Sequence, residues 1–187
     1  MSAHCRLRGR LFVVSGPSGA GKSSIVSRLR GLPGVFYSVS FTSRPPRPGE
    51  VDARDYSFVS RARFDEMVAA GEFAESADVA GNLYGTPRAP LEAALGEGRT
   101  VVVEIDVQGA AQIKEKYGSA ILIFIEPPSM EALERRLRNR HTEPEDAIRR
   151  RLALAEREMQ YAPRYDYRVV NDDLERAIGE VKGIMRV

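Results

Sequence analysis

A glycine-rich segment near the start of the chain has the composition of a phosphate-binding loop. Residues 16–23 read GPSGAGKS, which fits the pattern G-x-x-x-x-G-K-[ST]. The segment lies between a short apolar run at 11–14 and a helical pattern at 22–30, which is the context that such a loop requires. Its glycines allow backbone N–H groups to turn inward around a phosphate, and the helix N-terminus adds the positive end of its dipole. A glycine-rich turn that matches by chance is the alternative, and the flanking strand and helix argue against it.

Side chains of this loop suit the chemistry of a nucleoside triphosphate. Lys22 can reach the β- and γ-phosphates, and the Ser23 hydroxyl can bind Mg²⁺. The residues expected to bind the triphosphate are Gly16, Pro17, Ser18, Gly19, Ala20, Gly21, Lys22, Ser23 and Ser24.

The loop alone does not distinguish a GTPase, an ATPase motor and a small-molecule kinase. A GTPase would carry a base-reading N-K-x-D motif, and Asn171-Asp172-Asp173, the nearest approach in the sequence, lacks the lysine. A motor normally needs a longer chain than 187 residues. A kinase needs a second anion site for its acceptor.

Two arginines on a proline-rich stretch are candidates for that second site. Residues 42–50 read TSRPPRPGE, in which prolines surround Arg44 and Arg47. Because proline fixes φ and is excluded from helix interiors and central strands, we expect a rigid loop or sheet edge. Planar guanidinium groups match phosphate oxygens in pairs, and a stiff loop lowers the entropy cost of holding them ready. Solvated loop arginines are the plainer interpretation.

Apolar runs along the chain predict the elements that position these groups. Five of them, of which the clearest are rich in Val and Ile without alternation, look like buried parallel strands: 11–14, 35–39, 101–105, 121–125 and 168–170. Helical patterns occupy 22–30, 90–95, 110–116, 129–140, 143–161 and 174–185. Thr142 with Glu145, and Asp172 with Glu175, resemble capping boxes at helix starts. Alternating β and α units predict an α/β fold, a doubly wound parallel five-stranded sheet flanked by helices.

Residues 40–88 interrupt this alternation. They are rich in Pro, Gly and Arg, with a β-like piece at 56–59 and one helix at 61–70. We interpret them as a small α+β insertion within a single domain that spans residues 1–187.

Composition excludes several classes of protein. The chain has 187 residues, of which 43% are hydrophobic and 29% charged, and its net charge is +2. This charge is too small for a strongly basic nucleic-acid binder, and no apolar run approaches the roughly 18 residues that span a bilayer. Cys5 is the single cysteine, so neither an internal disulfide nor a thiolate metal site is expected. We expect a cytoplasmic protein with no obligate protein partner.

Beyond these patterns, the motifs of the whole chain resemble those of the guanylate kinases. From residue 11 to residue 185 they occur in the family's order: GPSGAGKSS, SRPPRPGEVDARDYSFVS, GNLYGTP, VEIDVQG, ERRLRNRHTEPEDAIRRRL and VVNDD. The resemblance implies transfer of the γ-phosphoryl group of ATP to GMP, and to dGMP, giving ADP and GDP, with Mg²⁺ as cofactor. It also implies a division into a core (1–39, 89–135 and 152–187), a GMP-binding insertion (40–88) and a helical lid (136–151).

The resemblance assigns the acceptor site to the insertion. Arg44, Arg47, Tyr56 and Tyr84 would grip the GMP phosphate. The base would be read by Ser40, Glu75 and Thr86, with Asp106 as a further candidate for the GMP site. A carboxylate accepts both the N1–H and the N2 amino group of guanine, and a site built on buried hydrogen bonds rejects a base that leaves its polar groups unpaired.

The donor site would combine the phosphate loop with residues from the end of the chain. Arg136 and Arg140 share a helix face at i,i+4, and Arg151 would join them over the phosphates. An ion-paired surface helix is the plainer interpretation of these arginines. The resemblance also places Asn171 and Asp172 at the adenine. Catalytic roles fall to Lys22, Arg44 and the three lid arginines.

Two carboxylates end the run at 101–105. Glu104 or Asp106 could hold Mg²⁺ through water, beside Ser23. Asp106 could equally contact the guanine, and the sequence does not decide between these alternatives.

Two rival functions can be weighed. Guanylate-kinase-like domains of scaffold proteins bind phosphopeptides and typically lack a sound phosphate loop or lid arginines, whereas Lys22, Arg140 and Arg151 are present here. A kinase for another phosphorylated acceptor, such as a ribose phosphate, would have no use for Glu75. One departure from many relatives is Phe41-Thr42-Ser43, where those relatives have His-Thr-Thr.

Overall fold

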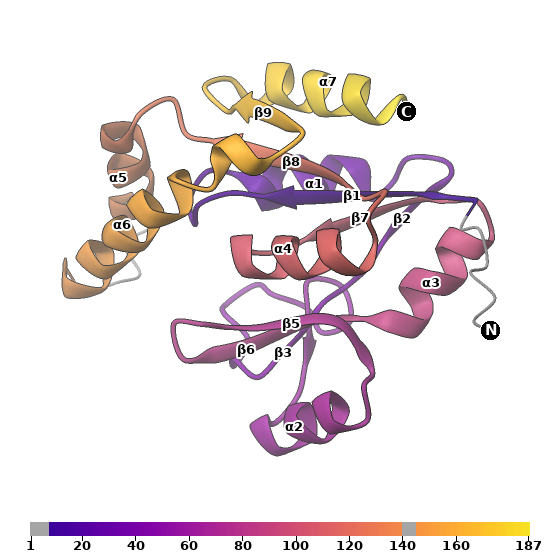
Figure 1. Ribbon diagram of the computed structural model, residues 1–187. Helices are drawn as coiled ribbons and strands as arrows, with labels where there is room; N and C mark the ends of the chain where they lie inside the picture. Colours follow the sequence, from indigo (N-terminus) through magenta and orange to yellow (C-terminus); the bar gives the residue numbers. More distant parts are fainter. Residues whose placement is uncertain (1–7, 140–144) are drawn as a thin grey trace.

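A five-stranded parallel sheet forms the centre of the protein (Figure 1), seen in a computed structural model that describes residues 8–139 and 145–187. The strand order is β2-β7-β1-β8-β9, and every neighbouring pair is parallel. The strands are β1 (Arg10–Ser15), β2 (Val35–Tyr37), β7 (Thr100–Glu104), β8 (Ile121–Glu126) and β9 (Tyr167–Val170). All five strands predicted from the sequence are therefore confirmed.

Helices cover both faces of this sheet. On one face lie α1 (Lys22–Leu29) and α7 (Leu174–Met185), and on the other lie α3 (Arg88–Gly96) and α4 (Val107–Lys116). Side chains of β1 alternate between them: Phe12 and Val14 pack with α1 and α7, whereas Leu11 and Val13 pack with α3 and α4. Each such burial contributes about 1.5–3 kcal/mol to folding. Because both faces are covered, the interiors of the central strands are apolar, and the doubly wound arrangement is confirmed.

A smaller mixed sheet lies beside the core, next to α4 (Figure 1), in the order β4-β3-β6-β5. Its elements are β3 (Phe41–Thr42), β4 (Ser57–Phe58), α2 (Arg61–Ala69), β5 (Phe73–Val79) and β6 (Asn82–Pro87). Strand β6 is antiparallel to both β3 and β5, while β3 and β4 are parallel. A small apolar core of Phe64, Met67 and Phe73 stabilises the sheet.

Hairpin β5–β6 was not predicted from the sequence. Its turn places Ala80 and Gly81 at φ angles of 52° and 84°, as a two-residue hairpin turn requires. The sequence gives little sign of it, because Glu75 occupies a buried position of β5 where an alternating pattern would show an apolar residue.

Two helices, α5 (Met130–Arg138) and α6 (Glu145–Met159), pack together as a helical hairpin, at the left in Figure 1, at the opposite end of the central sheet from α3. They pack through Leu133, Leu137, Ile148 and Ala155. Ser129 caps α5 by accepting a hydrogen bond from the Ala132 N–H, at 3.1 Å. The capping box predicted at Thr142 lies outside the described residues. A short 3₁₀ helix, η1 (Ala162–Arg164), leads from α6 into β9.

The predicted cap of the last helix is wrong by one residue. Asp173, not Asp172, is the N-cap of α7, and its Oδ1 accepts from the Arg176 N–H at 2.8 Å. Asp172 instead pairs with the Arg176 side chain, and Glu175 pairs with Arg28 across to α1. Because α7 begins at Leu174, a cap at position 172 would be one residue too early to reach its first free N–H groups.

Within the described part of the chain, no helix combines the length and the apolar character needed to cross a bilayer.

Candidate active site

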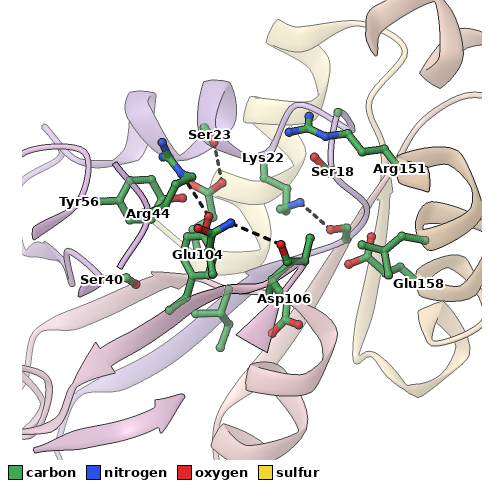
Figure 2. Close-up of a pocket in the computed structure, with 18 of the residues that line it drawn as sticks. Ser18, Lys22, Ser23, Ser40, Arg44, Tyr56, Glu104, Asp106, Arg151 and Glu158 are labelled. Atoms are coloured by element: carbon green, nitrogen blue, oxygen red, sulfur yellow. Dashed lines mark hydrogen bonds between the residues drawn. The ribbon is translucent and has the colours of Figure 1, made fainter. Parts of the chain in front are cut away.

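A pocket of about 300 Å³ lies between the C-terminal ends of β1 and β7 and the small mixed sheet. This edge of an open parallel sheet is where ligands of α/β proteins generally bind. Figure 2 shows Ser40, Tyr56 and Arg44 on one side of the pocket and Arg151 and Glu158 on the opposite side. Sixteen of the expected site residues line it: Gly16, Ser18, Gly19, Gly21, Lys22, Ser23, Ser24, Ser40, Arg44, Arg47, Tyr56, Glu75, Tyr84, Glu104, Asp106 and Arg151.

The glycine-rich loop connects β1 to α1 and forms one wall of the pocket. The Lys22 Nζ donates to the carbonyl oxygens of Gly16 and Pro17, at 2.5 and 2.9 Å, so its ammonium group lies within the curve of the loop. Gly21 has φ 94°, and a Cβ at this position would lie 2.1 Å from Asn171 Nδ2. Only glycine fits both the left-handed backbone and this close approach.

An oxygen pair suited to a divalent cation lies at the start of α1. The Ser23 hydroxyl donates to Glu104 Oε1 at 2.6 Å. A hydroxyl oxygen beside a carboxylate is the type of ligand set that Mg²⁺ prefers. Asp106 is otherwise engaged: it is the N-cap of α4, and its two oxygens accept from Gly109 N and Gln108 Nε2 at 2.9 and 3.1 Å. The contacts therefore place Glu104, rather than Asp106, directly beside Ser23.

Arg44 is held at the rim of the small sheet by several contacts. Its Nε donates to Tyr84 Oη at 3.2 Å, and its Nη2 donates to both oxygens of Glu50, at 2.8 and 3.0 Å. The residue is only 9% exposed, and its guanidinium carbon lies 5.5 Å from the centre of the Tyr56 ring. Arg47 is exposed, and its backbone N–H donates to Glu50 at 2.7 Å. The proline-rich stretch is thus a loop that presents two arginines and two tyrosines to the pocket.

At this rim the positive charge of Arg44 is paired with the carboxylate of Glu50. Burial alone would raise the pKa of the Glu50 carboxyl, but hydrogen bonds from Arg44 and from the Arg47 N–H outweigh it and lower that pKa. Burial raises the pKa of the Tyr56 hydroxyl well above its ordinary value, so this group remains a neutral donor. The rim therefore offers cationic and neutral donors, which suit an anion.

A buried carboxylate lies deeper in the pocket, on β5. Glu75 is 3% exposed and accepts from the Thr86 hydroxyl of the paired strand β6 at 2.6 Å. Burial raises the pKa of Glu75 to about 7, Thr86 opposes this, and nearby Asp106 adds to it. The Ser40 hydroxyl is also buried and has no hydrogen-bond partner. A carboxylate and a free hydroxyl in one recess suit a flat polar ligand that carries several donors and acceptors.

The expected lid arginines have different surroundings. Arg151, on α6, lines the pocket. Arg136, on α5, does not line the pocket. It donates to the carbonyl oxygens of Asn171 and Ala20, at 2.7 and 3.5 Å, and so connects α5 to the phosphate loop and to the segment after β9. Arg140 lies outside the described residues.

Six other expected residues do not line the pocket: Pro17, Ala20, Thr86, Arg136, Asn171 and Asp172. Asn171 is 5% exposed, and its Nδ2 donates to the Ala20 carbonyl at 2.7 Å. Asp172 is exposed and pairs with Arg176, which lowers the pKa of its carboxyl.

Some lining residues were missed from the sequence. Glu158 is 6% exposed, and Oε2 has no hydrogen-bond partner, while the Ser18 N–H donates to its carboxyl group. It lies seven positions after Arg151, on the same face of α6, and this spacing was the available signal. The β5–β6 turn also contributes Val79, Ala80 and Asn82, which were assigned no role because the hairpin itself was missed, although Asn82 lies in the GNLYGTP motif.

Comparison with known proteins agrees with this geometry. The family model described as guanylate kinase matches residues 8–187. A guanylate kinase of Gloeobacter violaceus is 51% identical over 177 residues, which are 94% of this chain and 86% of the relative. Another, of Rubrobacter xylanophilus, is 51% identical over 180 residues, which are 96% and 94% of the two chains.

A solved structure gives the same result. The crystal structure of guanylate kinase from Anaplasma phagocytophilum superimposes with a TM-score of 0.80 at 36% identity, covering 95% of this chain and 85% of the other. The match includes the central sheet, the small mixed sheet and the helical hairpin, since it extends over nearly the whole chain. The chain therefore belongs to the guanylate kinase family.

Proposed function

We propose how this chain performs the guanylate kinase reaction, in which the γ-phosphoryl group of ATP passes to GMP and gives ADP and GDP. The phosphate loop holds ATP, and the small mixed sheet holds GMP, on opposite sides of one pocket. An oxygen of the GMP phosphate forms the new bond to the γ-phosphorus, while the bond from that phosphorus to the β–γ bridging oxygen breaks. The attacking oxygen is already anionic at neutral pH, so no general base is needed.

The acceptor phosphate binds at the rim formed by Arg44, Arg47, Tyr56 and Tyr84. The support for this assignment is the fixed direction of the Arg44 guanidinium, which Tyr84 and Glu50 hold before any ligand arrives. Such preorganisation lowers the entropy cost of binding.

The guanine binds in the recess that contains Ser40, Glu75 and Thr86. An ionised Glu75 accepts from N1–H and from the N2 amino group, whereas adenine would present a lone pair at N1 and no amino group at C2. A buried acceptor that goes unpaired is costly, so AMP is rejected. Because the assigned contacts involve only phosphate and base, we expect dGMP to be accepted too.

The donor side relies on positive charge. Lys22 and Arg151 offset charge on the transferring group, with Arg136 holding the loop and Arg140 as a further lid cation. We assign the adenine to the segment of Asn171 and Asp172. Two anionic nucleotides repel each other, so catalysis here is positioning combined with electrostatic stabilisation.

Mg²⁺ would be held at Ser23 and Glu104, with Asp106 as a more distant carboxylate. When bound, it neutralises charge on the β- and γ-phosphates. The 2.6 Å contact between the Ser23 hydroxyl and Glu104 supports this assignment, because it brings a hydroxyl and a carboxylate oxygen together.

One observation carries this proposal: a carboxylate that is 3% exposed lines the same pocket as an intact phosphate loop. A binding module for phosphopeptides would need neither the buried acid nor the loop lysine. We place the enzyme in the cytoplasm with ATP and GMP as its partners, and with neither nucleic acid nor an obligate protein partner.

A coupled assay of ADP release tests the acceptor directly. GMP, dGMP, AMP, UMP and CMP are compared as acceptors at saturating ATP and Mg²⁺. We expect GMP and dGMP to be phosphorylated, and AMP to be slower by at least two orders of magnitude. Equal rates with AMP and GMP would contradict the assignment of Glu75.

Arg44→Met tests the acceptor phosphate site. Loss of the charged donor should raise the KM for GMP and lower kcat/KM on the order of 100-fold, with the KM for ATP little changed. Arg63→Met is the matched control, because Arg63 is an exposed arginine on α2 that does not line the pocket. Wild-type kinetics for Arg44→Met would remove Arg44 from the site.

A further inference from the structure

The main chain around Glu75 leaves the regular pattern of its sheet. Phe73 pairs with Pro87 and Glu75 pairs with Thr86, so Ala74 is an extra residue in β5, a bulge. Bulges bend a strand and redirect the neighbouring side chain, and they are common beside active sites. The direction in which Glu75 points therefore depends on what holds this irregular segment.

Strand β5 is also an edge strand of the small sheet. It has β6 on one side only, so main-chain groups on its other side have no strand partner. These groups need donors and acceptors from elsewhere in the protein, because unpaired backbone groups away from water are costly.

Helix α4 of the core supplies these partners. Gln112 pairs with both main-chain groups of Ser76: its Oε1 accepts from the N–H at 3.2 Å, and its Nε2 donates to the carbonyl oxygen at 2.8 Å. Lys116 Nζ donates to the carbonyl oxygen of Ala74 at 2.6 Å, at the bulge itself. The residues on both sides of Glu75 are therefore held by side chains of one helix.

A third position on the same face of α4 makes room for the carboxylate. A Cβ at Gly109 would lie 2.4 Å from Glu75 Oε2, so a larger residue would displace it. Gly109, Gln112 and Lys116 are spaced i, i+3 and i+7, which places them in one row along the helix. This row meets the three successive residues 74, 75 and 76 of β5.

We propose that Gln112 and Lys116 are positioning residues for guanine recognition, which act by holding the main chain on either side of Glu75. The proposal rests on the function assigned to Glu75 above. Neither side chain lines the pocket, so neither is expected to touch the nucleotide. Gln112 is uncharged, so its effect is on where the carboxylate lies, and small displacements in a preorganised site reduce activity strongly. Lys116 has the same effect through Ala74, and its charge also lowers the pKa of Glu75.

IMP makes the position of the carboxylate measurable, because it has the N1–H of guanine but lacks the N2 amino group. A correctly placed Glu75 accepts hydrogen bonds from both donors of GMP, whereas IMP offers it only one. The ratio of kcat/KM for GMP to that for IMP therefore reports how well Glu75 is aligned. A purely structural defect would lower both values together and leave the ratio unchanged.

Gln112→Ala is the principal test. We expect the KM for GMP to rise about tenfold from the loss of two hydrogen bonds, and the GMP/IMP ratio to fall by a similar factor. The KM for ATP should stay within about twofold, because the phosphate loop is untouched. Glu115→Ala is the matched control, since Glu115 is an exposed residue of the same helix. A wild-type GMP/IMP ratio in Gln112→Ala would overturn the proposal.

Lys116 provides an independent pair of variants. Lys116→Met removes the donor to Ala74 and should lower the GMP/IMP ratio, whereas Lys116→Arg keeps a donor and should restore it. If Gln112→Ala does not fold, this pair alone decides: equal ratios in the two variants would overturn the proposal.

Glu75→Gln, measured in parallel, separates failure of this inference from failure of the proposed function. If Glu75→Gln leaves the GMP/IMP ratio unchanged, Glu75 does not read the base and the proposed function of this recess fails. If Glu75→Gln abolishes the preference for GMP over IMP while Gln112→Ala and Lys116→Met keep that preference, only the present inference fails. Adding Gln112→Ala to Glu75→Gln should lower the ratio no further.

Discussion

Several side chains of the pocket are charged or polar although they are buried, and burial disfavours the charged form of an ionisable group. Glu75 is almost fully buried, yet its proposed task requires the ionised form. Thr86 stabilises that form with one hydrogen bond, but burial dominates and raises the pKa of Glu75 to about 7. The donors of guanine would complete the stabilisation, so binding GMP and ionising Glu75 favour each other.

This coupling predicts how activity depends on pH. The kcat/KM for GMP should rise as the pH passes through about 7 and level off above about 8, because the free enzyme must lose the Glu75 proton before the base can bind. Rate measurements from pH 5.5 to 9 with wild type and Glu75→Gln test this, and the variant corrects for the ionisation of GMP itself. The same rise in Glu75→Gln would show that another group titrates.

The free energy of unfolding should change in the opposite direction. Because the folded-state pKa of Glu75 lies above the ordinary carboxyl value, the folded protein binds this proton more tightly than the unfolded chain. Its contribution to stability is fully present at pH values below the unfolded pKa, and it is lost as the pH rises through about 7.

The types of residue at this site could be predicted better than their partners. Arg44 and Lys22 lie in the quoted motifs, the family resemblance assigned Glu75, and all three line one pocket. Glu50, which binds the Arg44 guanidinium, lies in the same motif but was assigned no role, because its contact with Arg44 depends on how a proline-rich loop closes. Glu158 shares a helix face with Arg151, but a charged residue on a helix is ordinarily solvated, so its burial could not be seen from the sequence.

Among the elements, those of the core could be predicted and those of the small sheet only in part. Strands such as β1 and β8 are apolar without interruption because helices cover both of their faces, and this pattern is readable in a single sequence. Strand β5 is an edge strand with a bulge and a buried acid, and strands β3 and β4 at the other side of the same sheet are only two residues long. Pairing, not local sequence, makes these segments strands.

Helix ends are also decided by geometry that a motif only approximates. The N-cap of α7 is predicted to contribute about 1 kcal/mol through the bond from the Arg176 N–H to Asp173. Asp173→Ala should therefore lower the Tm by roughly 2–4 °C, measured by thermal denaturation. Asp172→Ala is the control, and should have the smaller effect because it loses only exposed contacts. A larger fall in Tm for Asp172→Ala than for Asp173→Ala would show that Asp172, not Asp173, is the effective N-cap.

In the molecule as a whole, the pocket is assembled from segments far apart in the chain. The phosphate loop, the small sheet and helix α6 each supply one wall, and opposite walls carry the groups that we assign to GMP and to ATP. Such a site brings two anionic nucleotides together only if its walls approach and exclude water, which would otherwise accept the phosphoryl group. We therefore propose that residues 40–88 and the lid at 136–151 close over the core when both nucleotides are bound.

Small-angle X-ray scattering tests this closure. A compact chain of this length has a radius of gyration of about 16 Å, and GMP with a non-hydrolysable ATP analogue should reduce the measured value by about 1 Å. Because α4 holds β5 through Gln112 and Lys116, we expect the insertion to turn about this contact and to keep Glu75 beside the core. Arg44→Met at the same nucleotide concentrations should remain open, since GMP no longer binds its phosphate site. An unchanged radius for the wild-type protein with both nucleotides would refute closure and require a pocket that is already complete.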